Sequence, residues 1–559
     1  MLFFEHRLRT FYRHYQCESM NKRFQILLVR VPEFFFATES VPIEKQIHGA
    51  VMVPLGILHL GSYVRHQFSD VDVHYLDLHL KCKASNESKV SSVSVCDIVK
   101  LELEKALKDI RPSIVGVSCA FNAFADNFHQ TISEIKRIHP DAIVVVGGHY
   151  VSSYLGLLPQ DNDIDYAVIG EGEIPFTNFI REFKEGIRPQ NKIINKKEYL
   201  KSLEAFPPLD YDLINIEEYL KHEMNSIGGN QGRSLNMMTA RGCPQRCIYC
   251  ATHNVWDYDF RMQSAQNMFK QIVELKEKYF VETVMFVDDN FLWDKKRIKE
   301  FCKLMIDHQV DLNWYPSSVR INSLDEEIIS LMKKAGCRSL LLAIESGTKR
   351  IQKMIKKNVN LEHTKRMVRC LKQEGFRVYA QYILGFPGET IDEMKQTIQF
   401  SQELKCDWNL FGIATPLYGT EMYRIAVDSN YLLPNISVGS FSVGNIVTPE
   451  FSNKDVEDLL QDANYRTNFI DNDNFVNERY EEVLPIYESV ARSYPEHFVC
   501  KYMIWNIYKA TNRNEEAKVL YDNLRRLYLE KISYHEELIE RYGLKITFDE
   551  MQVEMHIKG

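Results

Sequence analysis

The sequence lacks several features that would assign it to common protein classes. It has no continuous apolar run of about 18 residues, the length that a membrane-spanning helix requires, so we expect no transmembrane segment. It has neither the Gly-x-Gly-x-x-Gly turn of dinucleotide-binding folds nor the Gly-Lys-Ser/Thr loop of nucleoside triphosphatases. Positive charge is not in excess, because 68 Lys and Arg face 76 Asp and Glu. Nucleic acid is therefore not the expected partner.

A cysteine pattern typical of secreted proteins is also missing. Of the 12 cysteines, those outside one cluster are scattered without pairing signals, as in proteins whose thiols stay reduced, and we expect a cytoplasmic location. Residues 1–20 contain three arginines but no continuous apolar core of a secretory signal. This extension is either a misassigned upstream segment, with the true start at Met20, or a basic amphipathic surface helix.

Three cysteines lie within eight residues, as Cys243-Pro-Gln-Arg-Cys247-Ile-Tyr-Cys250. Three thiolates can hold a [4Fe–4S] cluster and leave one iron without a protein ligand, and such an iron can bind a further molecule. A structural zinc site needs four protein ligands, and His253 could supply the fourth. The spacing alone leaves both alternatives open.

The chain from Ser234 to about Tyr423 alternates short apolar runs with amphipathic helical patterns, which is typical of β-α units. The apolar runs are 235–239, 283–287, 314–319, 339–344, 378–384 and 408–414. Six such units predict a partial barrel. In parallel β-α architectures ligands bind at the carboxyl ends of the strands, and the cysteine triplet follows the first run.

With these motifs the chain resembles the radical S-adenosylmethionine (SAM) superfamily. Tyr249 occupies the aromatic position before the last cysteine of that family's motif. Three further motifs lie in register with the predicted strand ends: Val287-Asp288-Asp289-Asn290-Phe291, Ile344-Glu345-Ser346-Gly347 and Gly385-Phe-Pro-Gly-Glu389. The resemblance implies that the amino and carboxylate groups of SAM bind the open iron, and that polar side chains at strand ends hold the rest of SAM.

The resemblance also implies roles for individual residues around SAM. Asp288, Asp289 and Asn290 would contact the methionyl ammonium, and Glu345 and Ser346 would face the ribose or the methionyl group. The other candidates for the SAM site are Tyr249, Arg320 and Gln381.

Simpler readings exist for several of these candidates. Arg320 would neutralise the SAM carboxylate, or form a surface ion pair with Asp325 or Glu326. The pair Asp288-Asp289 also suits a magnesium site, although the sequence shows no phosphate cradle beside it. The motif that ends at Glu389 is also typical of a strand-to-helix turn, in which the Glu389 carboxylate would stabilise the N-terminus of the following helix.

The amino-terminal third has the pattern of a second α/β unit. Strand-like runs at 24–31, 71–75, 114–118, 143–146 and 166–169 alternate with helical patterns at 55–65, 98–108, 125–138 and 174–183. This alternation predicts a doubly wound open sheet, whose ligand would bind beyond the strand carboxyl ends. Turn-forming sequences fall there, at 77–79, 119–122, 147–149 and 170–172.

This unit resembles the cobalamin-binding domain that precedes the barrel in one subgroup of radical SAM enzymes. The residues that the resemblance places near cobalamin are Asp77, Leu78, Ser118, Gly147, Gly148, His149, Gly170 and Glu171. Because no Asp-x-His-x-x-Gly follows the first strand, no histidine is assigned to cobalt. His149 would contact the periphery of the cofactor or cap the next helix. A vestigial sheet that has lost its cofactor is the alternative.

These patterns predict six segments: an extension (1–20), a cobalamin-binding-like α/β domain (21–185), a linker (186–232), a radical SAM partial barrel (233–430), a connection (431–473) and a helical tail (474–559). In the tail, Glu481-Glu482 and Tyr487 recur 34 residues later as Glu515-Glu516 and Tyr521. This period resembles tetratricopeptide repeats. Two repeats are fewer than an independent array needs, so we expect the tail to pack on the barrel or to bind a protein partner.

Together the resemblances imply a cobalamin-dependent radical SAM enzyme with a [4Fe–4S] cluster, SAM and cobalamin as cofactors. The expected reaction is transfer of a methyl group from methylcobalamin to an unactivated carbon through a 5′-deoxyadenosyl radical. The substrate would be a small molecule, a lipid or a peptide, and flavodoxin or ferredoxin would donate electrons. One alternative is a cyclase, a ring-contraction enzyme or another rearrangement enzyme with the same cofactors. The other is a non-catalytic repeat scaffold stabilised by zinc.

Overall fold

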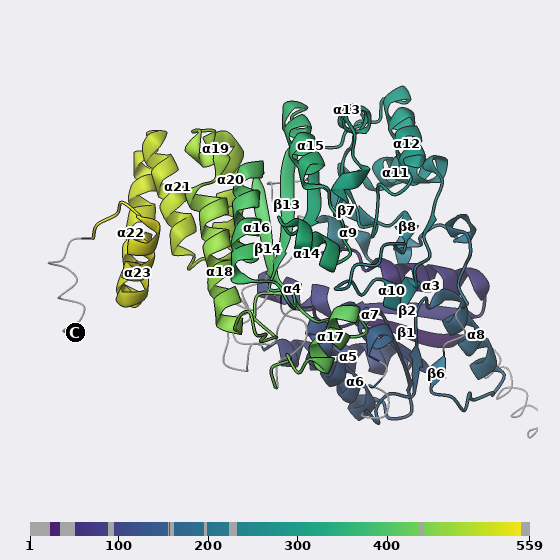
Figure 1. Ribbon diagram of the computed structural model, residues 1–559. Coiled ribbons are helices and arrows are strands. Elements are labelled where there is room, and N and C mark those ends of the chain that lie inside the picture. The colour runs from purple at the N-terminus through teal and green to yellow at the C-terminus, as the bar shows by residue number, and fades with distance from the viewer. Residues whose placement is uncertain are drawn as a thin grey trace, which may run out of the picture. The chain divides into compact units, whose positions relative to one another are not determined.

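The computed structural model describes residues 23–33, 51–87, 94–154, 156, 161–194, 198–222, 232–434 and 441–548 (Figure 1). The predicted extension 1–20 lies outside these ranges. The chain divides into two compact units, one made of residues 1–47 and 53–216 and the other of residues 48–52 and 217–559. The division after Ile216 falls within the predicted linker.

The first unit contains one parallel sheet. Its strands lie in the order β2-β1-β3-β4-β5-β6 and span β1 (Phe24–Arg30), β2 (Val71–Asp77), β3 (Ile114–Ser118), β4 (Ile143–Gly147), β5 (Tyr166–Val168) and β6 (Ile193–Ile194). The order reverses at β1, so the predicted doubly wound sheet is confirmed. The additional strand β6 has two residues, which is too short to leave a periodic pattern in the sequence.

The helices of the first unit are α3 (Leu55–Gln67), α4 (Leu78–Glu87), α5 (Val95–Ile110), α6 (Ala125–Ile138), α7 (His149–Ser153) and α8 (Glu173–Lys184). Four of them were predicted, whereas α4 and α7 were not. The expected turn at 77–79 is wrong, because β2 runs to Asp77 and α4 begins at the next residue. Asp77 Oδ1 accepts a hydrogen bond from the backbone N–H of Leu80 at 2.9 Å, as a helix N-cap does.

The second unit contains the predicted partial barrel. Its strands are β7 (Ser234–Met237), β10 (Thr283–Phe286), β11 (Asn313–Pro316), β12 (Ser339–Glu345), β13 (Arg377–Leu384) and β14 (Trp408–Ile413). They form two parallel sheets, β11-β10-β7 and β12-β13-β14. Parallel bridges from Trp314 to Cys337 and from Val319 to Leu342 join the sheets, so neighbouring strands follow chain order.

Helices between these strands cover the outside of the barrel. They are α11 (Ala265–Tyr279), α12 (Lys295–Asp307), α13 (Glu326–Lys334), α14 (Lys349–Met354), α15 (Leu361–Gln373) and α16 (Ile391–Leu404). The short helix α9 (Ile216–Leu220) precedes β7, α10 (His253–Trp256) follows the cysteine triplet, and α17 (Glu421–Asp428) follows β14. A short antiparallel pair, β8 (Ala240–Arg241) and β9 (Arg261–Met262), flanks the cysteine triplet. N-cap side chains such as Ser264, Asp294 and Asp325 fix where the outer helices begin.

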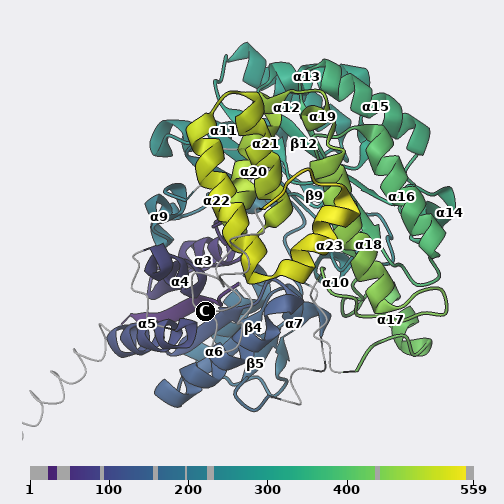
Figure 2. The same cartoon turned by 90° about the vertical axis from the view of Figure 1, so that its left-hand side faces the viewer.

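The carboxyl-terminal region is helical and begins earlier than residue 474. Its elements are α18 (Asn453–Tyr465), a π-helical turn (Arg466–Ile470), α19 (Asp473–Val476), α20 (Tyr480–Ser493), α21 (Phe498–Ala510), α22 (Asn514–Glu530) and α23 (Ile532–Tyr542). Helix α22 begins 34 residues after α20, and α23 begins 34 residues after α21, which matches the period in the sequence. Figure 2 shows these four helices grouped at one side of the second unit.

The tail packs on the barrel, as one of the two predicted alternatives expects. One apolar cluster joins Tyr379 and Trp408 of β13 and β14 to Tyr487 and Phe498 of the tail. Asn468 also pairs with the β14 backbone, because its Oδ1 accepts from the N–H of Asn409 and its Nδ2 donates to the same residue's carbonyl, both at 2.7 Å. This side chain supplies hydrogen bonds that the outer strand of the sheet lacks. Within the described ranges no helix combines the length and apolarity needed to cross a bilayer.

Candidate functional site

The cysteine triplet lies in a loop at the carboxyl end of the barrel strands. Gly242, just before Cys243, has a φ of +86°, and a Cβ there would lie 2.0 Å from the carbonyl oxygen of Asp259, so only glycine fits. Asp289 holds the loop on both sides. Its Oδ2 accepts from the N–H of Gly242 at 3.1 Å, and its Oδ1 accepts from the hydroxyl of Thr252 at 3.2 Å. The loop is therefore anchored to the end of β10.

The three thiols share one partly enclosed environment. Burial raises the pKa values of Cys243 and Cys247, and the proximity of Cys250 raises them further. Asn290 Nδ2 donates to the sulfur of Cys243 at 3.6 Å. In a [4Fe–4S] cluster each protein thiolate binds a different iron atom, and three thiols at this spacing suit such a cluster.

The zinc alternative gains no support from this geometry. The His253 ring stacks on Tyr258 with centroids 5.1 Å apart.

Glu345 organises the polar side of the site. It has a φ of +70°, which costs conformational energy in a non-glycine residue, and it follows a bulge in β12. Its Oε1 accepts from the Tyr249 hydroxyl at 3.0 Å and from Lys357 Nζ at 2.9 Å. Arg320 Nη2 donates to the carbonyl of Lys357 at 2.7 Å. The motifs thus bring Tyr249, Arg320 and Glu345 together, and their contact with SAM stays a prediction.

Lys357 is a candidate that the sequence analysis missed. Burial lowers its pKa, but the nearby Glu345 and Cys247 outweigh that effect, and the net shift is upward. The lysine therefore carries a positive charge beside Cys247. The sequence shows Lys356-Lys357 in a polar loop, a pattern typical of solvated surface, so only the folded chain reveals the buried amine.

Three buried polar atoms of this site have no protein hydrogen-bond partner. They are Asn290 Oδ1, Glu345 Oε2 and Arg320 Nη1. Buried polar atoms are normally paired, so unpaired ones at one site point to a ligand. Two acceptors and one cationic donor match SAM, whose ammonium and hydroxyl groups donate and whose carboxylate accepts. The residues present therefore fit a [4Fe–4S] cluster with SAM.

Both carboxylate oxygens of Asp289 hold the cysteine loop, so its contact with SAM stays a prediction. Two further predicted SAM contacts also have side chains occupied by protein partners. Asp288 accepts from the N–H and the hydroxyl of Thr239, both at 2.5 Å, and from the N–H of Ala240 at 3.0 Å, with Arg297 3.6 Å away. It ties β10 to the end of β7. The Ser346 hydroxyl lies 3.2 Å from that of Thr397 on α16. Contact of either residue with SAM stays a prediction.

The surroundings of Arg320 and Gln381 bear on the remaining predictions. The alternative ion pairs of Arg320 do not form, because Asp325 pairs with Lys295 at 2.8 Å and Glu326 with Arg366 at 3.5 Å. Gln381 shares a face of β13 with Ile383, since successive side chains of a strand alternate. Ile383 packs with Ile248 and Tyr249 of the cysteine loop, so Gln381 points into the barrel.

The turn from Gly385 to Glu389 supports the cysteine loop. Glu389 Oε2 accepts from the N–H groups of Gly385 at 2.8 Å and Phe386 at 3.0 Å. Burial raises the pKa of Glu389 to about 8, so the carboxyl is protonated at neutral pH. The Phe386 ring lies 5.6 Å from that of Tyr249. The interpretation as a strand-to-helix turn therefore fits the observed contacts.

In the first unit, the predicted cobalamin residues fall into two groups. Ser118, Gly147, Gly148, His149, Gly170 and Glu171 lie at the adjacent carboxyl ends of β3, β4 and β5. Gly148 has a φ of +100°, and a Cβ there would lie 2.4 Å from the carbonyl oxygen of Cys119. Burial lowers the pKa of His149 to about 4, so its ring is neutral. The backbone of β3 and β4 therefore requires glycine at 148, and contact of this group with cobalamin stays a prediction.

Asp77 and Leu78 lie on the other side of β1 from that group. Asp77 is buried, pairs with Arg30 at 3.2 Å and accepts from the Tyr75 hydroxyl at 2.8 Å. Leu78 is fully buried in the core. Contact of these two residues with cobalamin stays a prediction, since their side chains are occupied within the unit.

Two family models match the two parts of the chain. Residues 48–180 match the B12 binding domain, and residues 237–401 match the radical SAM superfamily. The second match includes the cysteine triplet and the motifs at 288–290, 345–346 and 385–389.

Individual proteins are similar over most of the chain. An uncharacterized methyltransferase of Pyrococcus horikoshii is 29% identical over 426 residues, covering 74% of this chain and 85% of the relative. An anaerobic magnesium-protoporphyrin IX monomethyl ester cyclase of Rubrivivax gelatinosus is 24% identical over 408 residues, covering 70% and 71%. The solved cobalamin-dependent SAM radical enzyme OxsB shares the fold, with a TM-score of 0.61 at 15% identity over 96% of this chain and 83% of that one.

Proposed function

The chain belongs to the radical SAM enzymes that carry a B12-binding domain, and we propose that it is a methyltransferase that methylates an unactivated carbon. One observation carries the proposal: a three-thiol loop ringed by unpaired buried atoms that suit SAM occurs in the same chain as a B12-binding domain. The relative named as a methyltransferase supports it.

The chain's own residues would hold the reactants in place. When bound, the cluster with SAM supplies a hydrogen-abstracting radical, and cobalamin supplies a transferable methyl group. Cys243, Cys247 and Cys250 would ligate the cluster. Asn290 Oδ1 and Glu345 Oε2 would accept hydrogen bonds from the ammonium and hydroxyl groups of SAM, and Arg320 would donate to its carboxylate.

Apolar side chains line the same site. Ile248, Ile383 and Phe386 form one buried cluster with Tyr249 beside the cysteine loop. Such a wall excludes water, which protects reactive species from side reactions and strengthens the electrostatic contacts inside. The geometry therefore suits radical chemistry on a bound organic substrate.

Product analysis separates methyl transfer from ring formation, the second candidate, which the relative named as a cyclase favours. The chain would be reconstituted anaerobically with iron, sulfide, cobalamin and SAM. Methyl transfer predicts S-adenosylhomocysteine together with 5′-deoxyadenosine during turnover, whereas a rearrangement yields only the second product. Metal analysis of the same sample gives iron and sulfide if the proposal holds, and zinc alone would contradict it.

We also propose an electron donor such as flavodoxin or ferredoxin, a cytoplasmic location and a small-molecule, lipid or peptide substrate. The first follows from the single-electron reduction that the cluster needs. The second rests on the scattered, unpaired cysteines of the sequence. A protein partner of the tail stays a further proposal. Reduction assays with each donor, and extraction of metabolites from a deletion strain, would test these points.

A further inference from the structure

A recess of about 500 Å³ lies at the opposite end of the barrel from the cysteine loop. Its floor is built where strands begin: Arg338 and Asp407 directly precede β12 and β14, and Asn313 and Arg377 are the first residues of β11 and β13. The tail contributes Arg479 and Glu482. The recess is therefore separate from the unpaired atoms at the carboxyl ends of the strands.

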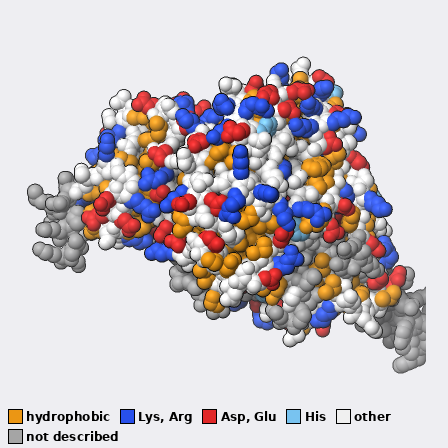
Figure 3. Space-filling view, viewed as in Figure 1, with side chains coloured by type: hydrophobic (Ala, Val, Ile, Leu, Met, Phe, Trp, Pro, Cys, Tyr) orange, Lys and Arg blue, Asp and Glu red, His pale blue; other side chains and the backbone are white. Residues whose placement is uncertain are grey.

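Positive charge dominates the lining of this recess. Two carboxylates, Asp407 and Glu482, face five cations: Lys333, Arg338, Lys372, Arg377 and Arg479. On the face shown in Figure 3, by contrast, Lys and Arg side chains are interspersed with Asp and Glu over the barrel helices. The excess of cations in the recess thus differs from the mixed charge of that face.

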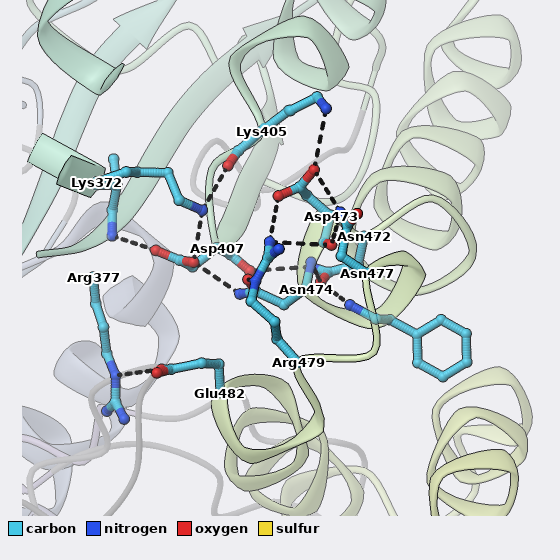
Figure 4. A network of polar contacts seen from close by, with 12 residues as sticks. Lys372, Arg377, Lys405, Asp407, Asn472, Asp473, Asn474, Asn477, Arg479 and Glu482 are labelled. Carbon is cyan, nitrogen blue, oxygen red and sulfur yellow. Dashed lines mark hydrogen bonds and ion pairs between the residues drawn. The ribbon is translucent and has the colours of Figure 1, made fainter. Parts of the chain in front are cut away.

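Three of these cations have carboxylate partners, as Figure 4 shows. Lys372 lies 3.1 Å from buried Asp407, and Arg479 lies 2.5 Å from Asp473. Arg377 lies 3.9 Å from Glu482, which is a long contact between two half-exposed side chains. Of these pairs, only that of Arg377 with Glu482 joins the barrel to the tail, and none of the three needs a ligand.

Lys333 and Arg338 differ from the other three. Among the described residues, neither has a carboxylate within ion-pair distance. Lys333 Nζ donates to the carbonyl of Gly375 and lies 5.0 Å from the centroid of the Phe376 ring. Burial lowers the pKa of Lys333, and the neighbouring Arg338 lowers it further. Two cations are thus held close together with no carboxylate of the described residues in ion-pair contact, and the charge of Glu374 acts on Lys333 only from farther away.

The guanidinium of Arg338 is oriented for an additional contact. Its Nε donates to Asn313 Oδ1 at 2.6 Å, which fixes the plane of the group and leaves its two terminal nitrogens for other acceptors. A planar guanidinium offers parallel N–H groups that match two oxygens of a phosphate or carboxylate, and a lysine adds a point charge. The volume of the recess lies in the range of small-molecule sites.

We propose that this recess binds a phosphate-bearing small molecule, with Arg338 and Lys333 as the pair that holds the phosphate. Because barrel and tail residues both line the recess, a bound ligand would also tie the tail to the barrel. The site is independent of methyl transfer, since its residues lie at the other end of the strands from the cysteine loop.

Isothermal titration calorimetry with inorganic pyrophosphate tests the proposal on the full reconstituted chain at constant ionic strength. We expect saturable binding to the wild type, and a loss of affinity of about tenfold or more in Arg338→Met and in Lys333→Met, because each removes a charge-assisted contact. Lys334→Met is the matched control: it removes the same charge from the next residue of α13, which is exposed and outside the recess. Its affinity should stay within about twofold of the wild type, since it removes no contact to the phosphate.

Two results would overturn the proposal. One is the absence of saturable binding to the wild type. The other is an equal loss in all three variants, which would indicate bulk charge and no site. If circular dichroism shows that Arg338→Met does not fold, Arg338→Lys replaces it: the charge is kept and the paired N–H groups are lost, so affinity should still fall. Since the readout is binding alone, failure here leaves the proposed methyl transfer untouched.

Discussion

Two groups of polar residues, one at each end of the barrel, differ in how their buried atoms are paired. At the carboxyl ends of the strands, Asn290, Glu345 and Arg320 keep buried atoms without protein partners. At the amino ends, Asp407 is fully engaged, since it accepts from the N–H of Val378 at 2.7 Å, from Asn474 at 2.8 Å and from Lys372 at 3.1 Å. Unpaired buried atoms of these three residues therefore surround the cysteine loop, whereas a fully paired carboxylate, that of Asp407, fastens the tail.

A substitution in the cysteine loop at the carboxyl end should have the largest effect. Cys243→Ala should remove one of three cluster ligands and abolish SAM cleavage, because the remaining two thiols cannot hold the cluster. Iron content and 5′-deoxyadenosine formation measure the effect. Cys370→Ala, on outer helix α15, is the control and should retain both. Undiminished SAM cleavage in Cys243→Ala would place the cluster elsewhere.

Asp407→Ala should break the network at the amino end without affecting SAM. Removing one partner of a buried ion pair costs about 3–5 kcal/mol, because Lys372 and Asn474 lose their acceptor. Thermal unfolding should therefore begin at a lower temperature, while the affinity for SAM stays unchanged. Asp428→Ala, at an exposed position at the end of α17, is the matched control and should leave the melting curve in place. A wild-type melting curve for Asp407→Ala would show that the network does not stabilise the tail.

The buried Glu389, at the carboxyl end of the barrel, should make the free energy of unfolding depend on pH. Its pKa is raised by burial from 4.5 to about 8, so between these values the folded chain keeps a proton that the unfolded chain releases. The free energy of unfolding should therefore fall as the pH rises from about 4.5 to 8, by about 1.4 kcal/mol per pH unit at most. Glu389→Gln keeps an acceptor for the two N–H groups but cannot titrate.

Unfolding curves at pH 6, 7 and 8 measure this difference. The variant should lose most of the pH slope and become more stable than the wild type at pH 8. Glu403→Gln, exposed on the same helix α16, should keep the wild-type slope. Equal slopes in the wild type and Glu389→Gln would contradict a buried, protonated carboxyl.

Much of the fold was predictable because its signals are local. The six barrel strands are apolar runs between amphipathic helices, and all six appear in the structure. Five lie within about two residues of the predicted bounds, which is the usual uncertainty of element ends, and β11 ends three residues earlier than predicted. Elements without such a pattern were missed. Strand β6 has only two residues. Helix α18 lies in the polar stretch 431–473, which was predicted as a connection, so its helical period was overlooked.

The site was predictable where it follows motifs and not where it depends on tertiary contacts. Tyr249, Asn290 and Glu345 belong to motifs at strand ends, so their convergence could be expected. The neighbours Asp288 and Asp289 look alike in the sequence, yet one ties β10 to β7 and the other holds the cysteine loop. The roles of the two carboxylates differ because each accepts from backbone N–H groups that only the folded chain brings near it. The burial of Lys357 likewise depends on tertiary contacts that the sequence does not show.

Asn290→Ala should have the smallest effect, and it tests whether the unpaired Oδ1 at the carboxyl end faces SAM. The variant removes an unpaired Oδ1 and a weak contact to Cys243, so folding should be unaffected while SAM loses one hydrogen-bond acceptor. A lost hydrogen bond to a charged group costs about 1.5–3 kcal/mol, which corresponds to roughly a tenfold to hundredfold weaker affinity for SAM. Equilibrium dialysis of SAM against the reconstituted enzyme measures this, with iron content as the check that the cluster remains. Unchanged SAM affinity with a full cluster would mean that the unpaired oxygen faces something other than SAM, and that unpaired buried atoms do not identify the cofactor end of this barrel.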